Sequence, residues 1–126
     1  MPLHQEVVRA IDRHRSLAED NAERARLENP RKHADYIRNN KTLAVKLEHA
    51  INSGNVNEEA KRAIESEIVN TGDDVARSQL GLNTIHLYEP KGSHMLTRAE
   101  YEERLKAAVR SGTERIKILK QAIGKR

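Results

Sequence analysis

Apolar residues recur at three- and four-residue steps along most of this chain, which is the period of amphipathic α-helices. Proline and glycine separate four such stretches, which lie at residues 3–28, 29–54, 57–81 and from residue 97 toward the end. No stretch shows the sustained two-residue alternation of a strand. We therefore predict an all-α protein, a small bundle of about four broadly antiparallel helices.

Several features predict where these helices begin and break. Asn29 and Pro30 suit the N-cap and first turn of the second helix. Poor helix formers at Gly72–Asp74 predict a kink or a short break in the third helix, and residues 82–88 are expected to form an extended connector. Asn40 lies within the apolar stripe of the second helix. The simpler interpretation is a partly exposed residue at a helix boundary, and the alternative is a buried residue that fixes register or oligomeric state.

The fourth helix has the clearest signals. Thr97 and Glu100 have the spacing of a capping box. Gly112 interrupts the apolar face, and a glycine there suggests close approach of a neighbouring helix. The face is our candidate partner-binding surface, and its residues are Tyr101, Leu105, Val109, Gly112, Ile116, Leu119 and Ile123.

Composition predicts a thin aliphatic core. The chain has 126 residues with no Phe, no Trp and three Tyr, so leucine, isoleucine, valine and alanine must fill the interior. Such cores suit helices packed side by side and oligomers. With no cysteine, disulfides and thiolate chemistry are excluded. We find neither a signal peptide nor an apolar run long enough to span a membrane, and we expect a cytoplasmic protein.

Charge is unevenly distributed along the chain. The net charge is +4, yet residues 96–126 hold nine Lys/Arg against four Glu, and residues 1–95 carry a net charge of −1. The change falls at Gly92–Met95, whose letters Gly-Ser-His-Met match the remnant of a cloning junction. We predict a three-helix segment at 1–91, a linker or cloning scar at 92–95, and a basic amphipathic helix at 96–126 that docks on the first segment. If the junction is artificial, the last segment is either a fused partner helix or part of a circular permutant.

The sequence contains few patterns that carry chemistry. Histidines never lie four residues apart, so we expect no metal site. Glu59, Glu65 and Glu67 do not share one helical stripe, and we interpret them as a solvated, salt-bridged face rather than a magnesium site. Glycine-rich phosphate loops and activated nucleophiles are absent from the sequence. We therefore expect no enzymatic activity, no catalytic residues, no cofactor and no small-molecule substrate.

The pattern that remains is interaction through helices. We predict a non-enzymatic protein-interaction module that binds a helical partner or self-associates. The alternative is an accessory protein that contacts nucleic-acid phosphates through the basic face of the last helix. Its candidate residues are Lys106, Arg110, Lys117 and Lys120. Glu102, Glu103 and Glu114 precede these lysines at helical spacing and would neutralise part of that face.

Overall fold

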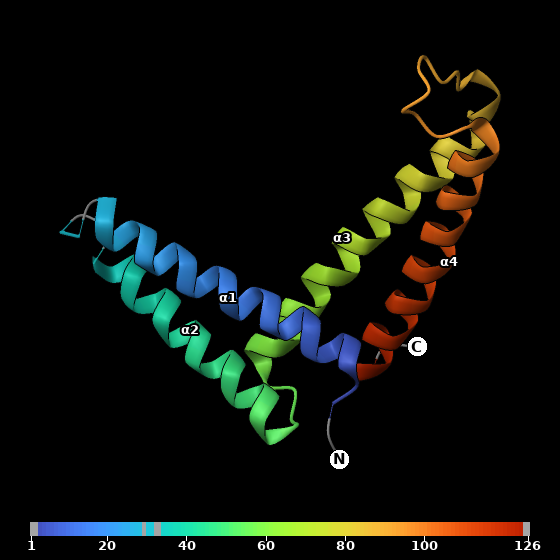
Figure 1. Cartoon of the computed structure of the whole chain (residues 1–126). Coiled ribbons are helices and arrows are strands. Elements are labelled where there is room, and N and C mark those ends of the chain that lie inside the picture. The colour runs from blue at the N-terminus through green and yellow to red at the C-terminus, as the bar shows by residue number, and fades with distance from the viewer. Residues whose placement is uncertain (1–2, 29, 32–33, 125–126) are drawn as a thin grey trace. The chain divides into compact units, whose positions relative to one another are not determined.

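The computed structural model describes residues 3–28, 30–31 and 34–124. These residues form four α-helices, a short 3-10 helix and no β-strand (Figure 1). The prediction of a small all-α helical bundle is confirmed. The elements are α1 (Gln5–Glu28), α2 (Ala34–Ser53), α3 (Glu58–Asn83), η1 (Ile85–Leu87) and α4 (Arg98–Ala122).

The chain divides into two compact units, and the boundaries fall inside helices. The first unit comprises residues 1–67 and 118–126, and the second comprises residues 68–117. Both α3 and α4 therefore contribute to each unit. Residues 92–95 lie in a loop of the second unit. The prediction that they join two pieces concerns the origin of the chain and stays a prediction.

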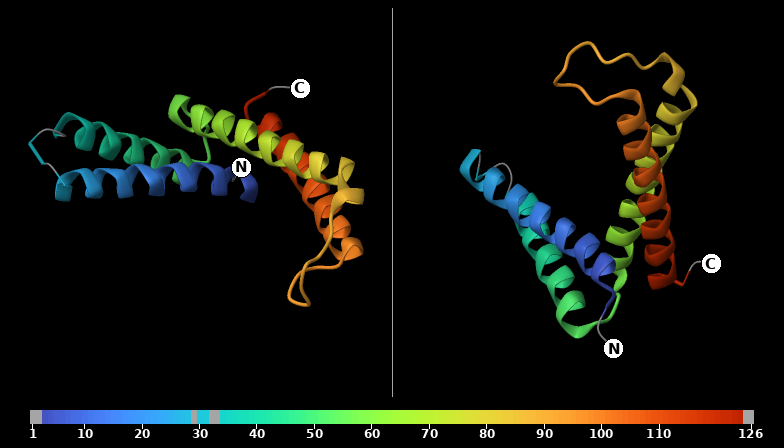
Figure 2. Two further views of the ribbon diagram at one scale, coloured as in Figure 1. Left: turned by 90° about the horizontal axis from the view of Figure 1, so that it is seen from above. Right: turned by 45° about the vertical axis from the view of Figure 1, so that its right-hand side comes forward.

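In the first unit, α1 and α2 form an antiparallel pair in close contact along their lengths (Figures 1 and 2). Alanine supplies much of the core, and small side chains at a helix contact allow the helix axes to approach closely. The helices of this unit therefore pack closely without aromatic residues. The buried apolar residues are Val7, Ala10, Ile11, Ala18, Ala22, Ala25, Ala44, Leu47, Ala50, Ala60, Ala63, Ile64 and Leu119.

The second unit is a helical hairpin in which residues 68–83 of α3 run antiparallel to residues 98–117 of α4 (Figure 2). The ring of Tyr88 meets Tyr101 edge-on, with centroids 4.4 Å apart. The Tyr88 hydroxyl donates a hydrogen bond of 2.8 Å to the carbonyl oxygen of Leu96, which ties the loop to the hairpin. Throughout residues 68–117, all described, the single fully buried residue is polar: Thr71. This unit therefore has almost no core of its own.

Two of the predicted helix beginnings are well supported. Asn57 caps α3, because its Oδ1 accepts a hydrogen bond of 2.8 Å from the backbone N–H of Ala60. The capping box of α4 is confirmed. The backbone N–H of Thr97 donates to Glu100 Oε1 at 3.0 Å, and the backbone N–H of Glu100 donates to Thr97 Oγ1 at 3.2 Å.

The predicted beginning of the second helix is wrong. Pro30 and Arg31 form a turn, and α2 begins at Ala34, while Asn29 lies outside the described residues. The chain must reverse direction between two antiparallel helices, and such a connection needs several residues. Proline at position 30 serves that turn and not the first turn of α2.

The predicted break near Gly72 and the extended connector do not occur. Helix α3 continues through Gly72 to Asn83, because one interior glycine costs only about 1 kcal/mol and packing can offset it. Residues 82–83 belong to α3, and residues 85–87 form η1. Two hydrogen bonds of Thr84 hold the chain in a turn instead of an extended connector. The Thr84 hydroxyl donates to the carbonyl of Leu80 at 2.9 Å, and the Thr84 carbonyl accepts from the N–H of Leu87 at 2.9 Å.

Asn40 is half-buried inside α2 and not at the helix boundary that the simpler interpretation required. Its Nδ2 atom is buried and makes no hydrogen bond with any described residue. A buried amide nitrogen without a hydrogen bond raises the free energy of the folded state, and a buried asparagine can fix one register or assembly at that cost. That role stays a prediction.

Two helical glycines of the second unit should respond oppositely to alanine. At Gly112, an added Cβ would collide with the Cγ2 methyl of Val75, so α3 comes close here through a side chain and not through its backbone. At Gly72, nothing lies within 4 Å of the added Cβ. We expect Gly72→Ala to raise the free energy of unfolding by up to about 1 kcal/mol. We expect Gly112→Ala to lower it, and Val75→Ala should remove part of that loss. Urea denaturation of Gly72→Ala, Gly112→Ala, Val75→Ala and the double variant Gly112→Ala/Val75→Ala tests this. Equal stabilisation by the alanines at positions 72 and 112 would contradict the close contact.

The capping box should also give α4 a measurable pH dependence. Hydrogen bonds from the backbone and side chain of Thr97 hold the pKa of the Glu100 carboxyl below its usual range. Because the folded-state pKa is the lower one, ionised Glu100 stabilises the fold above the unfolded-state pKa of about 4.3. That contribution is lost as the pH falls through the folded-state pKa. An NMR titration of Glu100 should give a depressed midpoint in the wild type and a less depressed one in Thr97→Val, which loses the hydroxyl but keeps the backbone N–H. Identical midpoints would contradict the capping box.

Candidate functional site

The predicted partner-binding face of α4 packs largely within the chain. Tyr101 contacts Tyr88, and Leu105 is so close to Gly81 that a Cβ there would lie 2.9 Å from its Cδ1. Val109 and Ile116 are half-buried. Leu119 and Ile123 belong to the first unit, where Leu119 is fully buried. Partner binding by this face stays a prediction, but the face is already engaged in holding the fold.

A different apolar surface is exposed on α3. At about 100° per residue, Val69, Ala76 and Leu80 share a face about 40° wide. Thr71 and Val75, which approach α4 at Gly112, lie on the opposite side of the helix. Val69 and Leu80 are each 63% exposed. We call Val69, Ala76 and Leu80 the α3 outer stripe.

Two opposite charges lie along one edge of the α3 outer stripe. Asp73 and Arg77 are both exposed and lie on the same edge, one turn apart. Within the helix, Arg77 Nη1 lies 3.6 Å from the Asp74 carboxylate. The other edge holds Gly72, Gln79 and Asn83, none of which is charged. The stripe thus has one charged and one neutral border.

Of the four residues of α4 predicted to contact phosphates, Lys106 is neutralised within the helix. Lys106 Nζ lies 3.6 Å from Glu102 and 3.8 Å from Glu103, as the spacing predicts. Arg110, Lys117 and Lys120 are exposed. Among the described residues none of these three forms an ion pair, and the expected pair of Glu114 with Lys117 is not formed. Part of the predicted basic face is therefore open.

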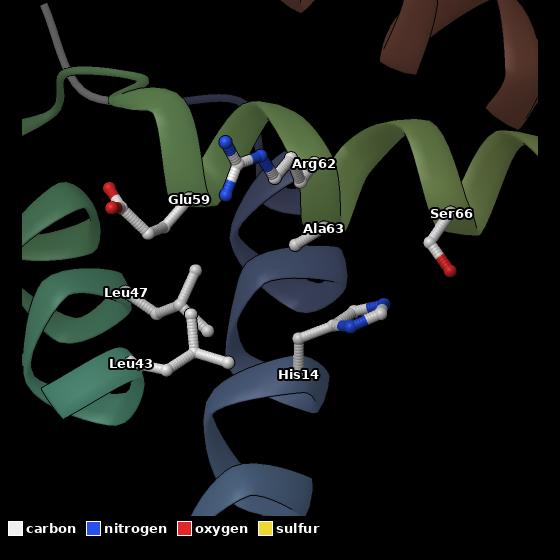
Figure 3. Close-up of a pocket in the computed structure, with 7 residues that line it drawn as sticks. All are labelled: His14, Leu43, Leu47, Glu59, Arg62, Ala63 and Ser66. Atoms are coloured by element: carbon white, nitrogen blue, oxygen red, sulfur yellow. The ribbon is translucent and has the colours of Figure 1, made fainter. Parts of the chain in front are cut away.

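A pocket of about 340 Å³ lies in the first unit, where α1, α2 and α3 meet (Figure 3). Leu43 and Leu47 project into it from α2, and the polar lining side chains come from α1 and α3. Glu59 lies at the rim of this pocket. Its carboxylate accepts a hydrogen bond from the backbone N–H of the same residue and lies beside the ammonium of Lys46, and both interactions hold the pKa of Glu59 below its usual range. The lining residues are His14, Leu43, Leu47, Glu59, Arg62, Ala63 and Ser66.

Beside this pocket, Glu67 contradicts the predicted solvated acidic face. It is 1% exposed, with Arg13 Nη1 at 3.6 Å and His14 Nε2 at 3.4 Å from its Oε1. A sequence signal existed, because Glu67 follows Ile64 by three residues on the buried face of α3. Burying a carboxylate requires compensating positive charge or hydrogen bonds, and the Arg13 guanidinium supplies part of the charge. Glu67 is therefore a buried, ion-paired residue of the first unit and not part of a solvated face.

The described residues show no further chemistry at the pocket. Ser66 makes no hydrogen bond with His14 in this part of the chain, so the pocket holds no paired nucleophile and base there. Across residues 3–28, 30–31 and 34–124, no three His, Asp or Glu side chains converge as metal ligands do. None of the described helices combines the length and apolarity needed to cross a membrane.

Comparison with protein-family models, with curated protein sequences and with solved structures found no match to this chain.

Proposed function

We propose that the protein is a non-enzymatic helical interaction module that binds a helical partner or a copy of itself. The observation that supports this best is the α3 outer stripe, in which Val69 and Leu80 remain 63% exposed on a unit with no fully buried apolar residue. Exposed apolar surface on a thin hairpin is characteristic of an interface. We keep the cytoplasm as its location in this proposal, because the chain has no cysteine for disulfides.

The spacing of the stripe favours a helix as the partner. Val69, Ala76 and Leu80 are separated by seven and four residues, so they span three turns of one helix, about 16 Å. Helices that dock in this way present apolar residues at steps of three, four and seven. Full burial of a valine or leucine side chain contributes about 1.5–3 kcal/mol, so two such residues can supply much of a moderate affinity.

A displayed library of amphipathic helical peptides, combined with sedimentation of the full chain, tests the proposal. We expect either peptide enrichment or self-association for the wild type, and its loss in Leu80→Glu. Val45→Glu is the matched control, because Val45 is an exposed apolar residue of the first unit. If neither method detects binding, or if Leu80→Glu and Val45→Glu behave alike, the α3 outer stripe is not an interaction surface.

The alternative function, phosphate contact by α4, is favoured by the exposed and unpaired side chains of Arg110, Lys117 and Lys120. Phosphate contacts release counterions, so the affinity for duplex DNA or RNA should fall steeply between low and physiological salt. Arg110→Glu and Lys117→Glu should each reduce the salt slope by about one, while Arg24→Glu on α1 should not. Absence of binding at low salt would exclude this alternative.

A further inference from the structure

We propose that the partner of the α3 outer stripe is a second copy of the chain, paired antiparallel about a two-fold axis at the level of residue 75. This inference is based on the proposed function, since it names the occupant of the same surface. It is argued from the register of the stripe, from the charges on its edge and from the needs of a two-helix hairpin.

In this register the apolar residues of the stripe in one copy lie opposite the apolar residues of the stripe in the other. Val69 lies six residues before position 75, and Leu80 lies five residues after it. In an antiparallel pair, Val69 of one copy therefore lies level with Leu80 of the other to within one residue, about 1.5 Å along the axis. The two-fold symmetry makes this contact twice. Ala76 lies next to the axis, where a small side chain lets the two helices approach closely.

The same register also pairs the charges. Asp73 lies two residues before position 75 and Arg77 two residues after it, on the same edge of the stripe. Antiparallel helices place equivalent edges opposite each other, so Asp73 of each copy faces Arg77 of the other. Arg77 has five donors and can retain Asp74 at the same time. A parallel pair would instead set the charged edge against Gly72, Gln79 and Asn83, which carry no charge.

Pairing also gives the second unit buried apolar side chains, which it lacks as a single hairpin. One hairpin of α3 and α4 has no fully buried apolar residue, whereas pairing through α3 places the four helices in a row and buries Val69 and Leu80 between the two central helices. Helix α4 lies on the opposite side of α3 from the stripe, and its Arg115 donates a hydrogen bond of 3.0 Å to Thr71 Oγ1 of α3, so the basic residues of α4 do not face each other across the contact. A second copy therefore satisfies both the apolar and the charged groups of the surface.

Sedimentation equilibrium of the full chain and of variants with reversed charges at positions 73 and 77 tests the inference. We expect the wild type to dimerise and Leu80→Glu to be monomeric. Asp73→Arg sets two arginines against each other, and Arg77→Asp sets two aspartates against each other. Either should weaken dimerisation about tenfold, given two exposed pairs per dimer. The double variant Asp73→Arg/Arg77→Asp should recover the wild-type association, because it restores opposite charges in the antiparallel register. Circular dichroism confirms that each variant remains helical.

The outcomes separate this inference from the proposed function. A wild type that is monomeric at all concentrations, but that binds a helical peptide through the α3 outer stripe, would overturn the inference and leave the proposed function standing. A dimer that is insensitive to Leu80→Glu would overturn the inference and the role of the α3 outer stripe in self-association, because its interface would lie elsewhere. A dimer that is lost in Leu80→Glu but is not recovered by the double charge exchange would overturn the antiparallel register.

Discussion

Ile64→Ala should lower the free energy of unfolding by about 2–5 kcal/mol, the range for deleting a large buried aliphatic side chain. Ile64 is fully buried at the centre of the first unit, on the part of α3 that packs with α1 and α2. Its loss leaves a cavity in a core built mainly from alanine, where few large side chains can move in to fill it. Urea denaturation followed by circular dichroism measures the effect as a lower midpoint.

Val45→Ala is the control, because it also shortens a β-branched residue of the first unit but one that is 65% exposed. Surface substitutions of this kind change stability by about 0.5 kcal/mol or less. If Ile64→Ala costs no more than Val45→Ala, the core does not lie where the structure places it.

Leu119→Ala should have a comparable effect, about 2–5 kcal/mol. The sequence assigned Leu119 to a partner-binding face, yet the side chain is fully buried in the first unit. Its removal should therefore destabilise the isolated chain. Thermal unfolding of Leu119→Ala, with the exposed neighbour Lys120→Ala as control, measures this. A variant that keeps its stability but loses association would show that Leu119 is an interface residue.

The periodicity of the sequence was enough to predict the fold class, the beginning of α3 and the capping box of α4. These features depend on local spacing, which the chain itself displays. Gly112 was also informative, because an interior glycine on an apolar face has few explanations other than close packing. The turn before α2 was mispredicted, since Pro30 suits both a turn and a first helical residue and only the antiparallel neighbour decides between them.

The environments of particular side chains were harder to predict. Glu67 was assigned to a solvated face because it shares no helical stripe with Glu59 and Glu65, although its spacing from Ile64 placed it on the inner face of α3. The α3 outer stripe was missed because Gly72–Asp74 suggested a broken helix. A break there would have separated Val69 from Leu80, and only the continuous helix brings them onto one surface.

Cysteine cross-linking at Ala76 is the sharpest test of antiparallel pairing of two copies through the α3 outer stripe. The chain has no cysteine, so each variant carries a single thiol. In the antiparallel dimer, residue 76 of the two copies lies within reach of a disulfide, which needs Cα atoms about 4.4–6.8 Å apart. Ala107→Cys is the matched control, because Ala107 is an exposed alanine on α4 of the same unit. Under mild oxidation the account predicts a rapid covalent dimer for Ala76→Cys and none for Ala107→Cys. Equal cross-linking of the two variants, or none in either, would contradict it.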